Sequence, residues 1–183
     1  IEQLQHKGEW QQTALILAES AKSIEIAGAD FLLICTNTMH KVASEISENI
    51  NIPLLHIADA TAEQLLNDGI TQVGLLGTRF TMSQDFYKGR LINKYGMKVI
   101  VPDEQQQDIV HSVIYNELCL GKINQDSKEA YLAIINNMAE RGAQAVILGC
   151  TEIALLVNQT DMSIPLYDTT AIHANAAVEK ALS

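Results

Sequence analysis

The sequence contains two stretches that align without a gap, GADFLLICT at residues 28–36 and GAQAVILGC at residues 142–150. Each begins with a Gly-Ala corner, continues as an apolar run and ends on a side chain that carries a proton, Thr36 or Cys150. An Ile-Pro-Leu sequence follows each copy, at residues 52–54 and 164–166. The match indicates a duplicated unit in which Thr36 and Cys150 are equivalent. Two such side chains on opposite sides of one cleft suit the transfer of a proton between the faces of a carbon atom.

Short apolar runs alternate with longer amphipathic stretches along the whole chain, which is typical of parallel sheets covered by helices on both faces. The expected strands cover residues 30–35, 54–57, 72–76, 98–101, 145–148 and 166–167. The expected helices cover residues 9–26, 40–49, 60–68, 83–95, 105–120, 127–141, 152–156 and 171–182. The predicted fold class is α/β, with two pseudo-symmetric three-layer domains, parallel sheets and an active site in the cleft between them. Residues 1–68 plus 166–183 would form the first domain and residues 69–165 the second.

The composition excludes several classes of protein. A chain of 183 residues, 48% of them apolar, can bury a core of one or two small domains. The formal net charge of -10 argues against binding to nucleic acid or to an anionic membrane, because both need clustered Lys and Arg. No apolar run approaches the roughly 20 residues of a membrane span, and the first residues lack a signal-peptide pattern. We therefore expect a cytoplasmic protein without nucleic-acid or membrane partners.

The three cysteines, Cys35, Cys119 and Cys150, favour free thiols, since no secretion signal accompanies them. Their spacing matches no zinc pattern, and we expect no metal site. Cys119 falls on the apolar face of an expected helix and is interpreted as a core residue. His40 and His173 lie near expected helix starts and are weaker candidates for a functional site.

The duplication also predicts that an element is missing. A strand and glycine turn at residues 73–78 precede the second copy, whereas nothing equivalent precedes the first copy in this sequence. We expect a lost strand-turn-helix unit of about 40 to 50 residues ahead of residue 1. Its loss would leave an exposed sheet edge and an open side of the cleft. The alternative is that the first half lacks this element.

Three strand-to-helix turns carry the candidate site residues. They are expected at the carboxyl ends of parallel strands, where they would define one crevice. Unpaired backbone N–H groups after Thr36 and after Cys150 favour an anion such as a carboxylate. The same position at a helix start favours the thiolate of Cys150 and would prepare it as a base. Glu152 could interact with the helix dipole or orient Cys150, and Thr78 adds a hydroxyl.

The motifs Cys35-Thr36-Asn37-Thr38-Met39-His40 and Gly149-Cys150-Thr151-Glu152-Ile153 together resemble those of the aspartate/glutamate racemase family. The similarity extends over the whole chain, including residues 75–82 and 167–173. The resemblance implies two similar α/β domains around a cleft, with two cysteines acting as base and acid on opposite faces of a small amino-acid substrate. It also implies the absence of pyridoxal phosphate or any other cofactor, and usually a homodimer.

This sequence departs from the family pattern in its first motif, which is normally Cys-Asn-Thr. Alignment on Asn37 and Thr38 puts Thr36 where the first catalytic cysteine belongs, as the internal repeat also does. Such a site resembles an atypical aspartate/glutamate-specific branch with threonine and cysteine. Cys35 is the minority candidate, because its side chain should point to the other side of the strand end.

The resulting hypothesis is an amino-acid racemase for aspartate, glutamate or a similar amino acid. Thr36 and Cys150 would be catalytic. The substrate would be bound by Gln5, Asn37, Thr38, Thr78, Thr151 and Glu152. The alternatives are a maleate isomerase, a hydantoin racemase, an arylmalonate decarboxylase, or a truncated chain that binds a carboxylate without catalysis.

Overall fold

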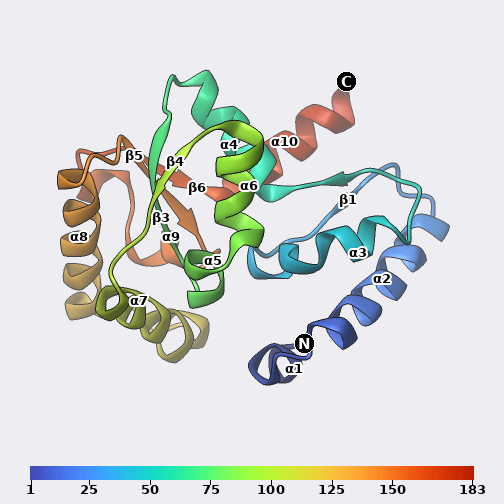
Figure 1. Ribbon diagram of the computed structural model, residues 1–183, viewed down its shortest axis with the longest axis horizontal. Helices are drawn as coiled ribbons and strands as arrows, with labels where there is room; N and C mark the ends of the chain where they lie inside the picture. The colour runs from blue at the N-terminus through green and yellow to red at the C-terminus, as the bar shows by residue number, and fades with distance from the viewer.

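The structure is a computed structural model that describes residues 1–183 (Figure 1). The α-helices are α1 (Glu2–Lys7), α2 (Trp10–Ile26), α3 (Ala43–Ser47), α4 (Ile57–Asn67), α5 (Arg79–Ser83), α6 (Asp85–Tyr95), α7 (Glu104–Asn116), α8 (Gln125–Glu140), α9 (Ile153–Leu156) and α10 (Thr169–Leu182). The 3-10 helices are η1 (Thr38–Val42), η2 (Leu118–Leu120) and η3 (Gln159–Asp161). The strands are β1 (Leu32–Leu33), β2 (Leu54–Leu55), β3 (Gln72–Gly77), β4 (Lys98–Ile100), β5 (Ala145–Gly149) and β6 (Leu166–Asp168).

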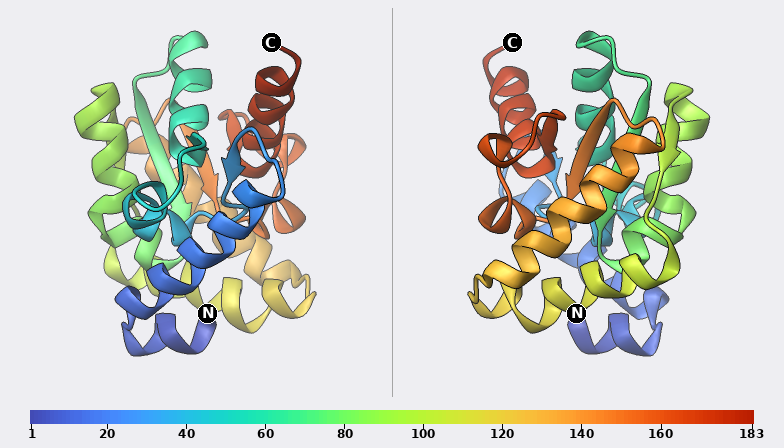
Figure 2. Two further views of the ribbon diagram at one scale, coloured as in Figure 1. Left: turned by 90° about the vertical axis from the view of Figure 1, so that its right-hand side faces the viewer. Right: turned by 90° about the vertical axis from the view of Figure 1, so that its left-hand side faces the viewer.

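The strands form two sheets in which every pair is parallel. One sheet is the pair β1-β2, and the other has the order β4-β3-β5-β6. Helices lie on both sides of the four-stranded sheet, as Figure 2 shows. The predicted α/β class with parallel sheets is therefore confirmed.

Side chains of the four-stranded sheet alternate between two buried layers, because successive residues of a strand point to opposite faces. Leu76 and Val146 pack in a core cluster with residues of α7 and α8. Leu75 and Ile147 pack on the other face with residues of α4 and α6. This double burial accounts for the nearly continuous apolar character of β3 and β5.

The duplicated unit is visible in the backbone. Leu32 N donates to Pro53 O and Val146 N donates to Pro165 O, each at 2.9 Å, so the pair β1-β2 is held like the pair β5-β6. Both glycine corners have positive φ, 94° at Gly28 and 99° at Gly142. Glycine adopts that conformation without a steric penalty, which allows the chain to turn sharply from a long helix into each strand.

The C-terminal segment, residues 166–183, contacts both sheets, and the expected division of the chain into domains is not decided by these contacts. That division places residues 166–183 with the first domain. Strand β6 pairs with β5 and puts Leu166 opposite Val146. This pairing follows the duplication, since β6 pairs with β5 as β2 pairs with β1. Helix α10 reaches the small sheet through His173, whose Nε2 donates to Leu55 O at 2.8 Å. The division into domains stays a prediction.

Several elements differ in extent from the expectations. The first strand covers two residues instead of six, and α1 was not expected. The expected helix over residues 105–120 ends at Asn116, because Glu117 adopts φ -127° and ψ -69° before η2 begins. These changes bring α1 and η2 to the rim of the pocket described below.

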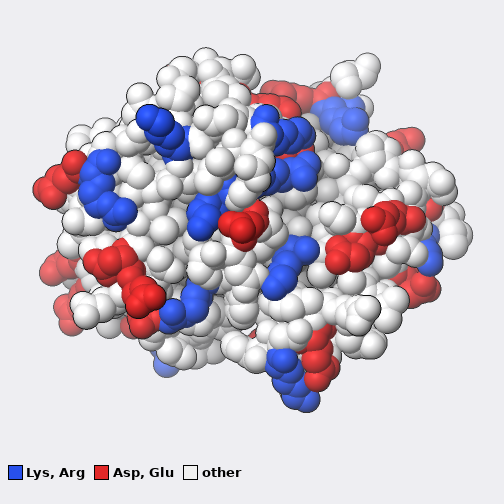
Figure 3. All heavy atoms as spheres, in the orientation of Figure 1, with Lys and Arg blue, Asp and Glu red and all other residues white.

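Charged side chains of both signs are interspersed over the face shown in Figure 3. One ionic group joins two helices: Asp59 of α4 bonds Arg90 of α6 at 2.5 Å and Lys94 at 2.7 Å. None of the helices combines the length and the apolar character that a membrane-spanning helix requires.

Candidate active site

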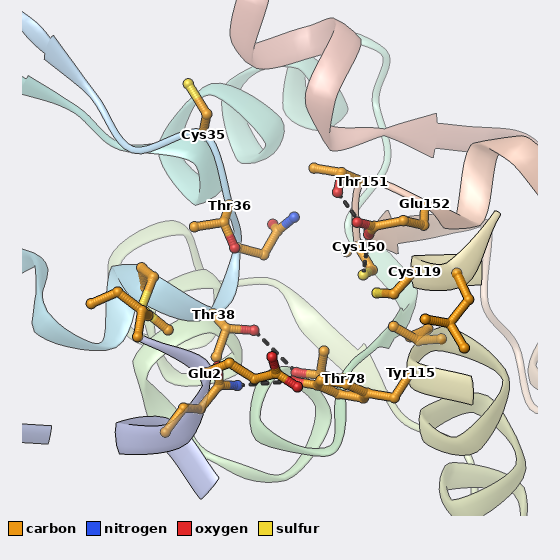
Figure 4. A pocket seen from close by; sticks show the side chains of 17 residues that line it. Glu2, Cys35, Thr36, Thr38, Thr78, Tyr115, Cys119, Cys150, Thr151 and Glu152 are labelled. Carbon is orange, nitrogen blue, oxygen red and sulfur yellow. Dashed lines mark hydrogen bonds between the residues drawn. The ribbon is translucent and has the colours of Figure 1, made fainter. Parts of the chain in front are cut away.

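A pocket of about 500 Å³ lies at the carboxyl ends of the strands, where the predicted loops meet (Figure 4). All eight predicted site residues line this pocket: Gln5, Thr36, Asn37, Thr38, Thr78, Cys150, Thr151 and Glu152. The lining of the pocket also contains residues that the sequence did not indicate, among them Tyr115 and Cys119.

Two glycines bring the second and third loops together. Gly77 ends β3 and Gly149 ends β5, and the two residues are partners in the sheet. A Cβ atom on Gly149 would lie 2.6 Å from Leu76 O, and one on Gly77 would lie 2.9 Å from Gly149 O. A side chain at either position would push the strands apart. Thr78 and Cys150, which follow the glycines, consequently leave adjacent strand ends toward the same pocket.

The loop that carries Thr36 is fixed by a buried histidine. His40 Nδ1 bonds Thr36 O at 2.8 Å, and His40 Nε2 accepts a hydrogen bond from Ile57 N at 3.2 Å. Since Nε2 accepts, Nδ1 carries the proton and donates to the Thr36 carbonyl. Burial lowers the pKa of His40 to about 4, which keeps the imidazole neutral at pH 7. The ring also packs against His56, with 4.3 Å between ring centroids.

The loop that carries Cys150 contains a thiol and a carboxylate in contact. Cys150 Sγ donates to Glu152 Oε2 at 3.0 Å, and Thr151 Oγ1 donates to the same oxygen at 2.7 Å (Figure 4). Partial burial acts to raise the pKa of Glu152, but these two hydrogen bonds outweigh it and the pKa is lowered. Glu152 is therefore an ionised acceptor beside a protonated thiol.

The expectation of a favoured thiolate at Cys150 is wrong for this state of the protein. Burial, and after it the neighbouring Glu152 carboxylate, raises the pKa of the Cys150 thiol. The helix that follows, α9, has only four residues and contributes a small dipole. Cys150 would thus need a proton acceptor before it could act as a base, and Glu152 is the carboxylate within hydrogen-bond distance of its thiol.

Cys119 is a pocket residue, contrary to its interpretation as part of the core. It lies in η2, it is exposed, and its thiol points toward Cys150 and Glu152 in Figure 4. Partial burial and the charge of Glu152 raise its pKa. The backbone break at Glu117 turns Cys119 out of the helical pattern on which its assignment was based. No signal in the sequence would have indicated this break.

Three hydroxyl groups form a chain at one wall of the pocket: Thr38 and Thr78 line the pocket, and Thr81 is fully buried. Thr38 Oγ1 and Thr78 Oγ1 are 3.1 Å apart, and Thr78 Oγ1 and Thr81 Oγ1 are 3.3 Å apart. Three hydroxyl hydrogens serve two contacts, so one hydrogen remains for another acceptor. The backbone N–H groups of Asn37, Thr38 and Thr151 also have no acceptor within the protein. The hydroxyl wall and these N–H groups, which come from more than one loop, can together donate several hydrogen bonds to an anion.

The side-chain amide of Asn37 has a hydrogen-bond partner for its nitrogen but none for its oxygen. Asn37 Nδ2 donates to Thr169 Oγ1 at 3.1 Å, and Thr169 Oγ1 donates to Leu148 O at 2.9 Å. The other amide atom, Asn37 Oδ1, is buried without a hydrogen-bond partner. The Asn37 side chain therefore has an acceptor without a partner.

Two further predicted residues behave differently from each other. Gln5 comes from α1 and donates through Nε2 to the Tyr115 hydroxyl at 3.0 Å, which ties α1 to α7 across the pocket. Cys35 lines the edge of the pocket but is exposed and points away from Cys150 in Figure 4. That orientation agrees with the expectation that Cys35 and Thr36 lie on different sides of the strand end.

The charged side chains that line the pocket are acidic. Glu2 and Glu152 contribute carboxylates, and no Lys, Arg or His is among the lining residues. Arg79, the one basic residue in the three loops, forms an ion pair with Asp108 of α7 instead. No group of three or more His, Cys, Asp or Glu side chains is arranged to hold a metal ion.

Comparisons with known proteins agree in pointing to one family. The sequence model of the Asp/Glu/Hydantoin racemase family matches residues 2–177. The chain is 25% identical over 170 residues to the broad specificity amino-acid racemase RacX of Bacillus subtilis, covering 91% of this chain and 71% of RacX.

Two crystal structures are similar in fold and in sequence. A candidate Asp/Glu racemase from Yersinia pestis has a TM-score of 0.94 and 53% identity, with 100% of this chain and 79% of that chain covered. An aspartate racemase homologue from Pyrococcus horikoshii has a TM-score of 0.87 and 35% identity, with coverage of 98% and 79%. The matched region includes every loop of the pocket, and the chain belongs to the Asp/Glu/Hydantoin racemase family.

Proposed function

We propose that this protein is an amino-acid racemase that interconverts L and D enantiomers by 1,1-proton transfer without a cofactor. The observation that carries the proposal is the presence of Thr36 and Cys150, from equivalent positions of a duplicated unit, in one pocket of about 500 Å³. A pocket of that size admits a small amino acid between the two side chains. Membership in the racemase family supports the same reaction.

In the proposed reaction, Glu152, Cys150 and Thr36 each accept and release one proton. Glu152 accepts the thiol proton of Cys150, and the resulting thiolate removes the Cα proton of one enantiomer. Thr36 donates its hydroxyl proton to the opposite face of the carbanion. The carboxylic acid of Glu152 then returns a proton to Thr36 through water. Cys150 ends the cycle as a thiol, Glu152 as a carboxylate and Thr36 as a hydroxyl, so protons balance.

The two directions of this cycle are not equivalent. Cys150 has an ionised carboxylate at 3.0 Å to take its proton, whereas Thr36 has no carboxylate among its hydrogen-bond partners. A threonine hydroxyl is a far weaker acid than a thiol, so it makes a poor base for a Cα proton. We therefore propose strongly different rates from the two enantiomers.

The hydroxyl wall is the proposed site of the substrate α-carboxylate. Thr38 and Thr78 have a hydroxyl hydrogen to donate, and the free N–H groups of Asn37, Thr38 and Thr151 add fixed dipoles. Such donors stabilise the negative charge that develops on the carboxylate as the Cα proton leaves. Gln5 has a second amide hydrogen available for a side-chain carboxylate, since only one contact to Tyr115 occupies it.

Aspartate, glutamate or a similar small amino acid is the proposed substrate. The relatives from Yersinia pestis and Pyrococcus horikoshii support an acidic amino acid, while RacX supports a broader range. The family resemblance further leads us to propose a homodimer in the cytoplasm. Sedimentation of the purified protein tests the dimer.

Solvent deuterium incorporation tests the reaction. Both enantiomers of aspartate and glutamate are incubated with the protein in D₂O, and Cα deuteration is followed by NMR. We expect exchange with at least one amino acid, faster from one enantiomer than from the other. Binding without exchange would instead support a carboxylate-binding chain without catalysis. Turnover of maleate, a hydantoin or an arylmalonate, with no exchange at any amino acid, would replace the racemase by that activity.

A further inference from the structure

Two thiols converge on one carboxylate in the pocket. Cys150 Sγ donates to Glu152 Oε2 at 3.0 Å. Cys119 lies close enough to the same carboxylate that, after burial, the charge of Glu152 is the main cause of the raised pKa of the Cys119 thiol. Figure 4 shows the Cys119 thiol directed toward Cys150, with the two residues on different segments, η2 and the loop after β5. The proposed proton transfer uses Cys150 and leaves Cys119 without a role.

The cysteines differ in their access to solvent and in their direction. Cys119 is exposed, whereas Cys150 is only partly accessible. A small oxidant that enters the pocket therefore meets Cys119 first. Cys35 is exposed as well, but it points away from Cys150 in Figure 4. Cys119 is thus the cysteine placed to react with Cys150 inside the pocket.

The segment that carries Cys119 is a short surface turn. Helix η2 has three residues and lies between Glu117 and Gly121, whose φ of 71° ends it. Leu118 is buried and anchors the turn, while Cys119 and Leu120 are exposed. A disulfide needs Cα atoms about 4.4 to 6.8 Å apart. Any adjustment toward that geometry falls on this turn, which has few buried contacts, and leaves the buried strand β5 in place.

We propose that Cys119 and Cys150 form a reversible disulfide when hydrogen peroxide enters the pocket. The peroxide oxidises the Cys119 thiol to a sulfenic acid and releases one water. Cys150 then attacks the sulfenic sulfur, its thiol proton passes through Glu152 to the departing hydroxyl, and a second water leaves. Two thiols and one peroxide give one disulfide and two waters. Each sulfur loses one electron, and each peroxide oxygen gains one.

The disulfide would act as a switch on the pocket. The bond itself is independent of the proposed function, but the loss of activity rests on it, because Cys150 in a disulfide cannot remove a Cα proton. A small dithiol would restore both thiols by exchange. The disulfide would also protect Cys150 from irreversible oxidation to a sulfinic acid, since a sulfenic acid that condenses with a thiol goes no further.

Mass spectrometry of the peroxide-treated protein tests the bond directly. Without reductant, we expect the intact mass to fall by about 2 Da, the two hydrogens lost, and digestion to release one peptide pair that contains Cys119 and Cys150. Cα exchange should fall at least about 100-fold and return after dithiothreitol. Cys35→Ser is the matched control and should behave as the wild type. A gain of about 16 or 32 Da without the loss of 2 Da, or a disulfide that contains Cys35, would overturn the proposal.

Two variants separate the steps. Cys119→Ser should show neither the loss of 2 Da nor an inactivation that dithiothreitol reverses; reversible inactivation in this variant would prove the proposal wrong. In Cys150→Ser the sulfenic acid at Cys119 has no thiol to condense with, so dimedone should label Cys119. Absence of that label would exclude the proposed first step. Failure of the racemase proposal looks different, because the disulfide then forms in a protein that has no Cα exchange to lose.

Discussion

The two copies of the duplicated unit share a frame and differ in what surrounds their last side chain. Each strand pair is tied by the same backbone bond, to Pro53 O in one and Pro165 O in the other. In the first copy, the carbonyl of Thr36 is held by a neutral, buried His40. In the second copy, Cys150 is held through its own thiol by Glu152. The backbone frame thus holds Thr36 and Cys150 at equivalent positions, whereas the hydrogen-bond partners of the two residues differ.

Cys150→Ser should have the largest effect on Cα exchange among the variants considered. In this variant both copies of the duplicated unit end in a hydroxyl. A serine hydroxyl is a much weaker acid than a thiol, so it does not give up its proton to Glu152 and act as a base. We expect Cα deuterium exchange to fall about 10³-fold or more, within the range for loss of a general base. NMR of the substrate in D₂O measures the loss.

Cys119→Ser is the matched control, because Cys119 presents a second thiol to the same pocket. We expect this variant to keep most of the wild-type rate. A larger loss for Cys119→Ser than for Cys150→Ser would transfer the role of base to Cys119.

The frame could be predicted from the sequence, whereas the partners of the site residues could not. The gapless alignment of residues 28–36 with 142–150 identified equivalent strand ends, and parallel strands bring their carboxyl ends together. The state of Cys150, however, depends on burial and on the rotamer of Glu152. The sequence shows that Glu152 is near but not that its carboxylate contacts the thiol.

Contacts between distant segments account for the other differences. Thr169 and Asn37 are far apart in the chain, and only the folded structure places their side chains 3.1 Å apart. Cys119 reached the pocket because α7 ends early at Asn116. Strand pairing joins β6 to β5, which are separated in the chain by α9 and η3.

The buried histidines next to the Thr36 loop predict that the protein loses stability in acid. Burial lowers the pKa of His40 from 6.5 to about 4 and that of His56 to about 2, so the unfolded chain binds protons that the folded protein does not. The free energy of unfolding is therefore fully retained above pH 6.5 and falls as the pH drops toward 4. The slope is about 1.4 kcal/mol per pH unit for each histidine. Urea unfolding at several pH values measures it.

The variant His40→Asn tests the contribution of His40, because the asparagine amide can donate to Thr36 O but does not titrate. We expect the slope between pH 6.5 and 4 to decrease by about one histidine equivalent. An unchanged slope would show that His40 is not the source of the acid sensitivity.

Glu152→Gln should separate the acidity of Cys150 from its catalytic use. Removal of the carboxylate charge lowers the pKa of the thiol, so alkylation by iodoacetamide at a fixed pH below that pKa should accelerate. Cα exchange should nevertheless fall about 30-fold, because no group accepts the thiol proton. Glu2→Gln removes the other carboxylate of the pocket and should leave the alkylation profile close to that of the wild type. If both rates fall together in Glu152→Gln, the carboxylate has only a structural role.

Thr36→Ala tests the proposed proton donor of the first copy and should have the smallest effect on Cα exchange. Cys150 can remove a Cα proton and return a deuteron to the same face without Thr36, so exchange with retention of configuration should persist. Inversion requires a donor on the other face, and water in place of the hydroxyl should slow it about tenfold. Chiral chromatography of the deuterated product gives the ratio of inversion to retention. A variant Thr36→Cys should restore inversion and bring the two directions closer in rate. If Cys35→Ser, rather than Thr36→Ala, removes inversion, the proton donor is Cys35 and the loop must turn during turnover.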